Sequence, residues 1–333
     1  MKLKFLYSFF AAILFVTTYG QKDSVPKPVF DDPVYHGAAD PVIVWNVKAK
    51  KWWMFYTNRR ATLNDSSGVA WVHGTRIGIA ESNDGKYWTY KDTANINYRP
   101  DAEYTFWAPD IVYDKGIYHM YLTYVPGVFT NWSHPRVIVH LTSKNLIDWA
   151  YESTLKLASE KLIDANVMQL QDGTWRLWYN NEASGKTMYY ADSKDLYNWT
   201  DMGKAGIGRG EGPKVFRWQN KYFMIVDIWK GMDVYSSDDM LVWKKQADRI
   251  LETPGLGNDD QAIGGHCDVV INNNRAFIYY FTHPGHRKDK PAAKNSFEDK
   301  RSVIQLAELK YENGVITCDR DAVVAGGLEK IKK

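Results

Sequence analysis

Acidic side chains and one imidazole recur at the start of five β-rich segments of the chain. They are Asp40 in "GAADP", Asp110 in "WAPD", Asp164 in "LIDANV", Glu211 in "GEGP" and His266 in "GGHCD". Turn capping explains any single one of them. Their recurrence indicates side chains that converge on one site. Several carboxylates in one site suit glycoside hydrolysis, in which one acid gives a proton to the leaving oxygen and another, ionised, activates water or attacks.

The segments that follow these residues share one pattern. Each is a β-rich run, a polar turn and a second run rich in aromatic residues, over 40–59, 109–125, 165–181, 212–228 and 267–283. Four further stretches begin with Ser, carry Asp or Asn at the second or third place, and end in Trp: "SNDGKYW" (82–88), "SKNLIDW" (143–149), "SKDLYNW" (193–199) and "SDDMLVW" (237–243). Such Ser and Asp/Asn side chains favour tight turns by bonding the nearby backbone.

These repeats predict an all-β fold. Strand, turn, strand, Ser-containing turn and strand make about four strands per unit, and five units predict a five-bladed β-propeller in a single domain over 21–333. The 14 Trp, 22 Tyr and 13 Phe residues favour strands, and most of them are expected in the core. The alternative is a β-sandwich, which does not explain the recurring turn.

The N-terminal segment reads as an export signal. Lys2 and Lys4 precede an apolar run that ends in small residues near Gly20, so residues 1–20 are predicted to be a cleaved signal peptide of a secreted or periplasmic protein. The rest of the chain has no apolar stretch long enough to span a membrane. The net charge of +3 over 333 residues gives no indication of nucleic-acid binding. Two cysteines, Cys267 and Cys318, make no disulfide framework, and we favour unpaired thiols.

Three of the carboxylates carry a resemblance to glycoside hydrolase family 43, over nearly the whole mature chain. Asp40 in "AADP" resembles the catalytic base of that family, and Glu211 in "GEGP" resembles its acid. Asp164 resembles the Asp that modulates the acid, although "LIDANV" has Ala and Asn where the family usually has Pro and Ser. The resemblance implies a five-bladed propeller that hydrolyses a terminal sugar with inversion. The expected sugars are α-L-arabinofuranose or β-D-xylose of plant or algal polysaccharides.

The resemblance also implies substrate and metal ligands. Arg301 resembles a late arginine near the terminal-sugar subsite, with Arg287 as a rival, and His266 resembles a channel histidine that binds calcium. Zinc is not indicated, because no His or Cys partners cluster with His266. Candidate residues for lining the substrate pocket are Trp107, Phe106, His36, Asp110 and Trp132, with His134 close to the last; for Asp110 a structural role is favoured over a chemical one.

Other functions remain open at this point. A phosphorylase would need a cationic cluster for phosphate, and a retaining fructan-type hydrolase would carry an "NDPN"-like motif that "AADPVI" does not match. Galactosidases, galactofuranosidases and α-neoagarobiose hydrolases share the expected architecture. A non-catalytic sugar-binding propeller is the non-enzymatic alternative. Exo action is expected from the long loops at 58–76 and 125–136, while linkage and oligomeric state are open.

Overall fold

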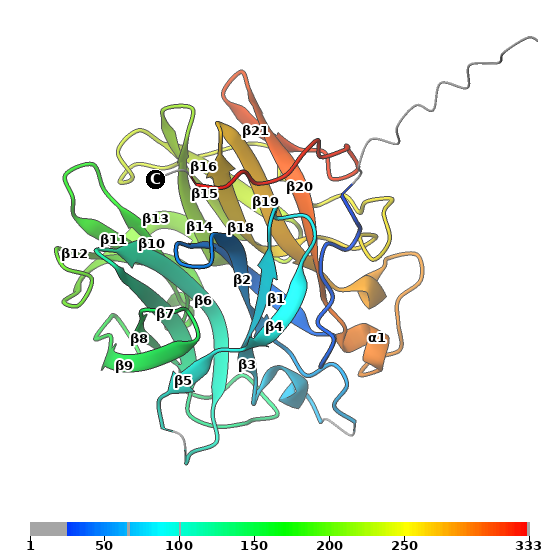
Figure 1. Cartoon of the computed structure of the whole chain (residues 1–333), viewed down its shortest axis with the longest axis horizontal. Helices are drawn as coiled ribbons and strands as arrows, with labels where there is room; N and C mark the ends of the chain where they lie inside the picture. The colour runs from blue at the N-terminus through cyan, green and yellow to red at the C-terminus, as the bar shows by residue number, and fades with distance from the viewer. Residues whose placement is uncertain (1–24, 65–66, 100, 332–333) are drawn as a thin grey trace, which may run out of the picture.

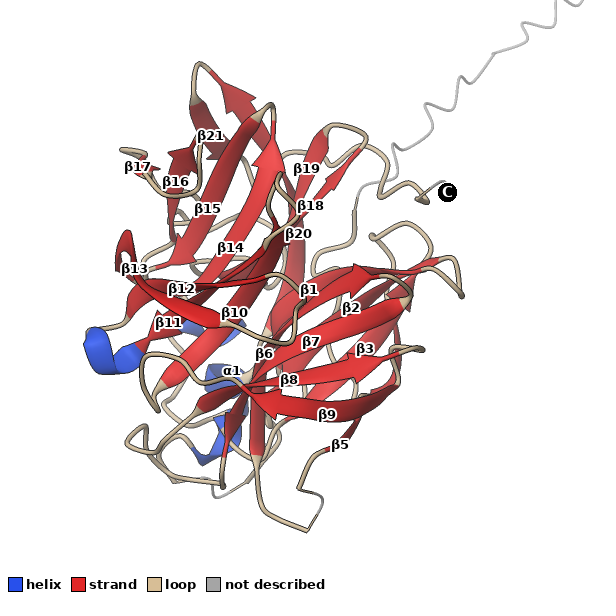
Figure 2. Cartoon of the chain, turned by 90° about the vertical axis from the view of Figure 1, so that its left-hand side faces the viewer, coloured by secondary structure: helices blue, strands red, loops and turns tan. Residues whose placement is uncertain are grey.

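The computed structural model describes residues 25–64, 67–99 and 101–331 of the chain. Five antiparallel sheets stand around a common centre in chain order, and the first strand of each contacts the first strands of its neighbours (Figure 1). The all-β five-bladed propeller predicted from the repeats is confirmed. Strands make up most of the ordered structure, with only a few short helical segments among the described residues (Figure 2).

The five sheets are called blades 1 to 5. Blade 1 contains β1 (Ala38–Asn46), β2 (Lys51–Asn58), β3 (Arg76–Ser82) and β4 (Thr89–Thr93). Blade 2 contains β6 (Thr105–Asp114), β7 (Ile117–Val125), β8 (Val137–Ser143) and β9 (Asp148–Thr154), with β5 (Asn95–Asn97) added in parallel to β9.

Blade 3 contains β10 (Leu162–Gln169), β11 (Trp175–Asn181), β12 (Thr187–Ser193) and β13 (Thr200–Arg209). Blade 4 contains β14 (Glu211–Trp218), β15 (Lys221–Asp227), β16 (Met232–Ser237) and β17 (Lys244–Lys245), and blade 5 contains β18 (Gly265–Asn272), β19 (Arg275–Thr282), β20 (Val303–Glu312) and β21 (Val315–Cys318). The helical segments are η1 (Ala70–Val72), η2 (Glu182–Ser184), η3 (Pro284–His286) and α1 (Phe297–Lys300).

The four Ser-containing stretches form the outer turns of blades 1 to 4. In the first, Ser82 Oγ accepts from the Gly85 backbone N–H at 2.8 Å, and Asp84 Oδ1 accepts from Lys86 N–H at 2.9 Å. The same pair of bonds recurs from Ser143 and Asn145, from Ser193 and Asp195, and from Ser237 and Asp239. These side-chain oxygens accept hydrogen bonds from backbone N–H groups of the turn and so stabilise it.

Aromatic and aliphatic side chains fill the wedges between adjacent blades. Trp149 and Phe55 pack between blades 1 and 2, while Trp178 and Met224 pack between blades 3 and 4. The largest fully buried side chains are mainly aromatic, so most of the aromatic residues serve the core, as expected. Flat rings suit these wedges because neighbouring twisted sheets diverge outward.

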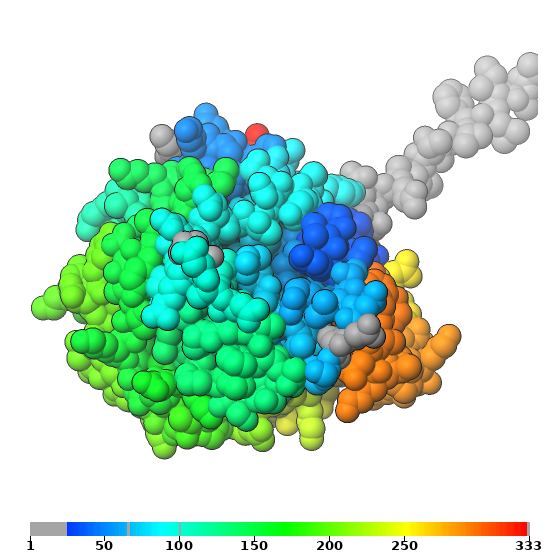
Figure 3. All heavy atoms as spheres, turned by 90° about the horizontal axis from the view of Figure 1, so that it is seen from below, coloured from blue at the N-terminus to red at the C-terminus, as the bar shows by residue number. Residues whose placement is uncertain are grey.

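The ring closes through the N-terminal segment. Val29 and Phe30 donate backbone hydrogen bonds to the Ile304 carbonyl at 3.0 and 3.3 Å, and Lys27 Nζ pairs with the buried Asp260 at 2.8 Å. Figure 3 shows the first described residues, in blue, close to the orange segment near residue 300. Chain closure between the first and last blades prevents the propeller from opening at that seam.

Other features of the chain can be placed against the earlier predictions. The proposed signal peptide over 1–20 lies outside the described residues. Within the described part, no helix is long and apolar enough to cross a membrane. Cys267 and Cys318 are both free thiols, which agrees with the unpaired state favoured above.

Candidate active site

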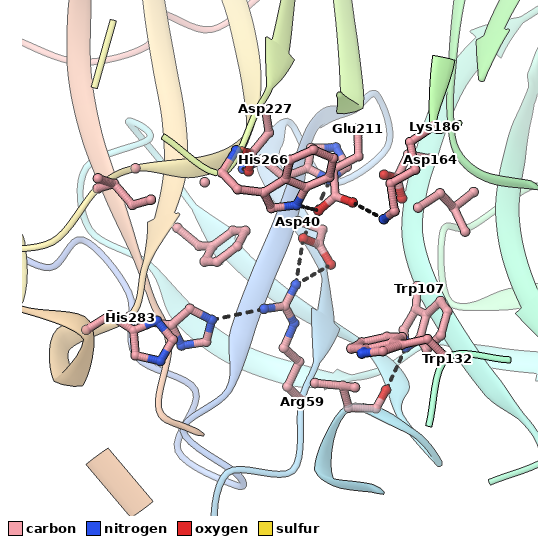
Figure 4. A pocket seen from close by; sticks show the side chains of 18 of the residues that line it. Asp40, Arg59, Trp107, Trp132, Asp164, Lys186, Glu211, Asp227, His266 and His283 are labelled. Atoms are coloured by element: carbon pink, nitrogen blue, oxygen red, sulfur yellow. Dashed lines mark hydrogen bonds and ion pairs between the residues drawn. The ribbon is translucent and has the colours of Figure 1, made fainter. Parts of the chain in front are cut away.

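A cavity of about 630 Å³ opens where the first strands of all five blades begin. Its lining includes Asp40, Asp164, Glu211 and His266, so four of the five residues that opened the sequence analysis meet there (Figure 4). Four indoles form much of the wall: Trp71, Trp107, Trp132 and Trp229. The volume falls in the range of small-molecule sites.

A β-bulge at the start of each first strand positions these residues. Asp40 and Asp164 stand at the same place in their bulges, with φ of 52° and 58°. In blade 4 that place belongs to Gly212, with φ of 57°, and Glu211 precedes it. A left-handed backbone at a residue other than glycine costs about 1 kcal/mol or more, and such strain gathers at functional sites.

Asp40 is a buried carboxylate between two cationic groups (Figure 4). Arg59 Nη2 donates to both of its oxygens, at 3.1 and 3.3 Å, and His266 Nδ1 lies 3.5 Å from Oδ1. Burial by itself would raise the pKa of Asp40, but Arg59 and His266 outweigh it and hold that pKa well below its usual range. Asp40 is therefore ionised at neutral pH.

Arg59 is held in place by a hydrogen bond to His283, which is itself bonded to the Arg301 carbonyl. His283 Nδ1 donates to the Arg301 carbonyl at 2.8 Å, which leaves Nε2 as acceptor for Arg59 Nη1 at 3.2 Å. Burial, followed by the charge of Arg59, lowers the pKa of His283 to about 3, so its imidazole is neutral. Because the Arg301 carbonyl can only accept, the neutral ring carries its proton on Nδ1. The free lone pair of Nε2 then orients the Arg59 guanidinium toward Asp40.

The imidazole of His266 carries a positive charge at neutral pH. Burial disfavours that charge, but the hydrogen bond to Asp40 and the charges of Asp164 and Asp227 raise the His266 pKa to about 9. The backbone N–H of His266 donates to Asp227 Oδ2 at 2.8 Å. His266 thus joins the carboxylate of blade 1 to that of blade 4.

Glu211 has a different environment from Asp40. Its Oε1 accepts from the indole Nε1 of Trp229 at 2.9 Å, and its Oε2 accepts from Lys186 Nζ at 3.2 Å. The Glu211 side chain is 25% exposed, whereas that of Asp40 is 8% exposed. Glu211 can therefore be reached from the cavity.

Asp164 lies beside Glu211, and its side chain is hydrogen-bonded to the backbone of blade 4. Asp164 Oδ2 accepts from the Gly212 N–H at 2.9 Å. Burial, followed by the negative charges of Glu211 and Asp40, raises the Asp164 pKa to about 7 despite the opposing charge of His266. The protonated form of Asp164 is therefore present in the neutral range.

Asp227 is a further buried carboxylate in the lining that the sequence analysis missed. It lies opposite Glu211 in the β14–β15 pair and accepts from the Trp229 N–H at 2.7 Å. Burial, followed by the charge of Glu211, raises its pKa to about 7. Its place in the sequence could have identified it, because the end of the second strand of an antiparallel pair lies beside the start of the first. By the same rule, the ends of the hairpin segments contain Arg59 and His283.

Of the proposed substrate ligands, Trp107 and Trp132 line the cavity, with ring centroids 5.9 Å apart. The other proposed ligands lie outside the lining: Phe106, His36, Arg301 and Asp110, and the rivals Arg287 and His134. Phe106 is fully buried between blades 1 and 2, because strand alternation turns it away from Trp107.

His36 and Arg301 are occupied elsewhere. His36 pairs with Asp31 at 3.0 Å and packs on Phe297. Arg301 Nη2 bonds Asp31 at 3.0 Å and Asp259 at 2.6 Å, so its fork is already satisfied. The arginine inside the cavity is Arg59, from blade 1 rather than blade 5.

Asp110 belongs to a polar ring in the central channel, two residues beyond the bulge position of its blade. It accepts from Val167 N–H at 2.7 Å and pairs with Lys214 Nζ at 3.4 Å, and Lys214 pairs with Asp268 at 2.6 Å. Asp268 in turn accepts from the Ile43 N–H of blade 1 at 2.7 Å. This ring joins blades across the channel, so the structural alternative for Asp110 fits the geometry.

A family model described as a probable glycosyl hydrolase domain, related to glycoside hydrolase family 43, matches residues 27–254. The chain belongs to this family. It is a glycoside hydrolase of the family 43 type, as the three carboxylate motifs predicted. No curated protein sequence matches it.

Solved structures of family 43 enzymes share the propeller of this glycoside hydrolase. A thermostable family 43 glycoside hydrolase has a TM-score of 0.64 at 16% identity, covering 91% of this chain and 98% of its own. A β-xylosidase has a TM-score of 0.62 at 12% identity, covering 85% and 95%. An exo-1,5-α-L-arabinanase from a bovine ruminal metagenomic library has a TM-score of 0.57 at 16% identity, covering 85% and 97%.

The calcium site expected at His266 finds little support in the donor set of this hydrolase. Calcium takes six to eight oxygen ligands. Among the described residues, no three His, Cys, Asp or Glu side chains gather as a possible metal site, and the Nδ1 of His266 faces Asp40. The residues present do not fit the ion, and no step below uses one.

Proposed function

We propose that this hydrolase removes a terminal, uncharged sugar from plant or algal polysaccharides by single displacement with inversion. Asp40 is the base that activates water, Glu211 is the acid that protonates the leaving oxygen, and Asp164 is the modulator. The observation that carries this proposal is the contrast between the environments of Asp40 and Glu211 in one cavity. A carboxylate that its cationic neighbours keep ionised suits the base, and a carboxyl that can be reached from the cavity suits the acid.

Asp164 supports the acid by its position. Its negative charge, when present, favours the protonated form of the neighbouring Glu211, and the Gly212 N–H holds it in place. Because Asp164 titrates near pH 7, the cluster keeps a proton close to Glu211 in the neutral range. Arg59 keeps the base ionised and oriented.

The charge balance of the cavity favours a neutral sugar. Every Arg and Lys among the described lining residues already pairs with a carboxylate: Arg59 with Asp40, Arg136 with Glu182, and Lys186 with Glu182 and Glu211. No unpaired cation in this lining is available for phosphate or a uronate, which disfavours the phosphorylase alternative. The indoles offer flat apolar faces, and the charged groups offer hydrogen bonds to hydroxyls.

Terminal arabinofuranose or xylose is the substrate we favour. The structural relatives include a protein named as a β-xylosidase and one named as an exo-arabinanase, and the resemblance in motifs points to the same pentoses. Exo action is supported by the two long loops, because Trp71 of the first and Trp132 of the second stand in the cavity wall. The N-terminal sequence supports export. Sequencing the mature N-terminus of the protein from its native host would test this.

The test is hydrolysis of aryl α-L-arabinofuranoside, β-D-xyloside, β-D-galactoside and β-D-galactofuranoside by wild type and Glu211→Gln, with product anomers followed by NMR. We expect one pentoside to be cleaved with inversion, and the Gln variant to lose at least about 100-fold in kcat on a substrate with a poor leaving group. A retained anomer would overturn the single displacement. Failure on this panel and on plant and algal oligosaccharides would favour the sugar-binding alternative.

A further inference from the structure

Lys186 is an unexpected neighbour for a catalytic acid. Its ammonium group lies 3.2 Å from Glu211 Oε2, on the cavity side (Figure 4). A cation at this distance favours the ionised carboxylate, which is the form that cannot donate a proton. Lys186 also has a left-handed backbone, with φ of 60°, in the turn that follows η2. The position is therefore strained as well as electrostatically opposed to the proposed role of Glu211.

Lys186 is shared with a second carboxylate. Glu182 Oε1 lies 2.8 Å from Lys186 Nζ, and Glu182 Oε2 lies 2.5 Å from Arg136 Nε. Arg136 is 3% exposed, and its Nη2 donates to the Trp132 carbonyl at 2.6 Å. Arg136, Glu182 and Lys186 form an alternating series, here called the ion chain. It runs from the Trp132 wall of the cavity, in blade 2, through blade 3 to Glu211 in blade 4.

Lys186 keeps its positive charge within the ion chain. Burial by itself would lower the pKa of Lys186, but Glu211 and Glu182 outweigh it and raise that pKa. The ammonium group therefore persists throughout the working pH range. Glu182 competes with Glu211 for the same cation, so the pull of Lys186 on Glu211 depends on Glu182.

The other titratable groups near Glu211 act in the opposite direction. Asp227 faces it from β15 and Asp164 from β10, and the pKa values of both are raised by the charge of Glu211. Each of them, when ionised, favours the protonated form of Glu211. Farther into the cavity, Asp40 and His266 are paired with each other and offset one another. On the remaining side, Trp229 donates a neutral hydrogen bond, and its ring lies 5.0 Å from both Lys186 Nζ and Arg209 Cζ.

We propose that the ion chain is a positioning device for Glu211. It fixes the carboxylate against the leaving-group side of the cavity and sets the upper pH limit at which Glu211 still carries its proton. The inference rests on the proposed role of Glu211 as the acid. Lys186 and Glu182 act with opposite signs in it, and no merely structural role of the two residues predicts that.

The opposite signs give the experiment. Lys186→Met removes the cation, so the alkaline limb of kcat/KM should move to higher pH, by about one unit. Glu182→Gln removes an anion and leaves Lys186 to Glu211 alone, so the limb should move to lower pH. Lys186→Arg should restore the wild-type limb. Lys204→Met is the control, since exposed Lys204 on β13 is a charge of the same blade outside the cavity lining.

The pH profiles should be measured on the pentoside from the panel that carries a poor leaving group, with thermal unfolding of each variant as a check on folding. Shifts of opposite sign in Lys186→Met and Glu182→Gln, with no shift in Lys204→Met, are expected. Equal shifts in both variants, or an unmoved limb in a folded Lys186→Met, would overturn the proposal.

A second measurement needs no substrate and separates this inference from the proposed function. The ¹³C signal of the Glu211 carboxyl carbon, assigned by its loss in Glu211→Gln, can be titrated by NMR in each variant. Its midpoint should move up in Lys186→Met and down in Glu182→Gln. If the wild type cleaves nothing but these midpoints move apart, the proposed function fails and the ion chain stands. If the enzyme is active and the titration midpoint of Glu211 is the same in wild type and both variants, the ion-chain proposal is wrong and the proposed function stands.

Discussion

Asp227 lies directly opposite Glu211 in the β14–β15 pair and bonds the start of blade 5 through the His266 N–H at 2.8 Å. In blades 1 and 2 the matching residue is threonine. Thr57 Oγ1 accepts from the Ala108 N–H at 2.8 Å, and Thr123 Oγ1 accepts from the Asp164 N–H at 3.1 Å. Blade 4 thus places a buried carboxylate where blades 1 and 2 have a hydroxyl.

Asp227→Thr should therefore change stability in a pH-dependent way. The pKa of Asp227 is raised to about 7 in the fold. Its contribution to the free energy of unfolding is therefore fully present below about pH 4, the pKa of an unfolded Asp, and is lost as the pH rises through 7. We expect the Tm of the variant relative to wild type to be higher at pH 8 than at pH 5, by a few degrees, given roughly 2–4 °C per kcal/mol. Calorimetry at both pH values measures this; a pH-independent difference would contradict it.

Arg59→Met should reduce kcat/KM by about 100-fold, because methionine cannot replace the guanidinium whose Nη2 donates to both oxygens of Asp40. Arg301→Met is the comparison, since Arg301 bonds Asp31 and Asp259 outside the cavity lining. Steady-state kinetics on the cleaved pentoside should show a change within about threefold for a folded Arg301→Met. The reverse ranking would restore Arg301 as the subsite arginine implied by the family resemblance.

Lys214→Met should destabilise the protein without weakening substrate binding. It would leave Asp110 and Asp268 buried in the channel without their shared cation, a loss of about 3–5 kcal/mol. Urea unfolding measures the free energy, and KM measured on the folded protein should stay at the wild-type value. A raised KM with unchanged stability would instead place Asp110 at the substrate.

Chelation tests the calcium expectation at His266. Since its imidazole is positively charged near neutrality and faces Asp40 at 3.5 Å, dialysis against EDTA at pH 6.5 should leave both Tm and kcat unchanged. Metal analysis of the dialysed protein is the control. A loss of activity that calcium restores, and that His266→Gln also shows, would establish His266 as a ligand.

The fold could be predicted because its signals are local. The Ser-containing turns bond their own backbone within three residues, and the hairpins read as adjacent runs, so each unit is recognisable without its neighbours. The carboxylates at the segment starts were also found this way. Asp40, Asp164 and Glu211 follow from their place before a first strand, since every first strand begins at one end of the ring.

The precise membership of the cavity could not be predicted in the same way. Asp110 lies two residues beyond the bulge position that Asp40 and Asp164 occupy, so it falls in the channel ring while they face the cavity. Phe106 and Trp107 are separated by the alternation of side chains along a strand.

The amino-acid sequence by itself thus determined the five-bladed architecture and the three carboxylates, because both are written in short repeated patterns. Only the tertiary structure brought Arg59 to Asp40 and Lys186 to Glu211, and paired Glu211 with Asp227 across two strands. These partners keep Asp40 ionised and surround Glu211 with charges of both signs. Electrostatic coupling depends on distance and burial, which residue type and spacing along the chain do not contain.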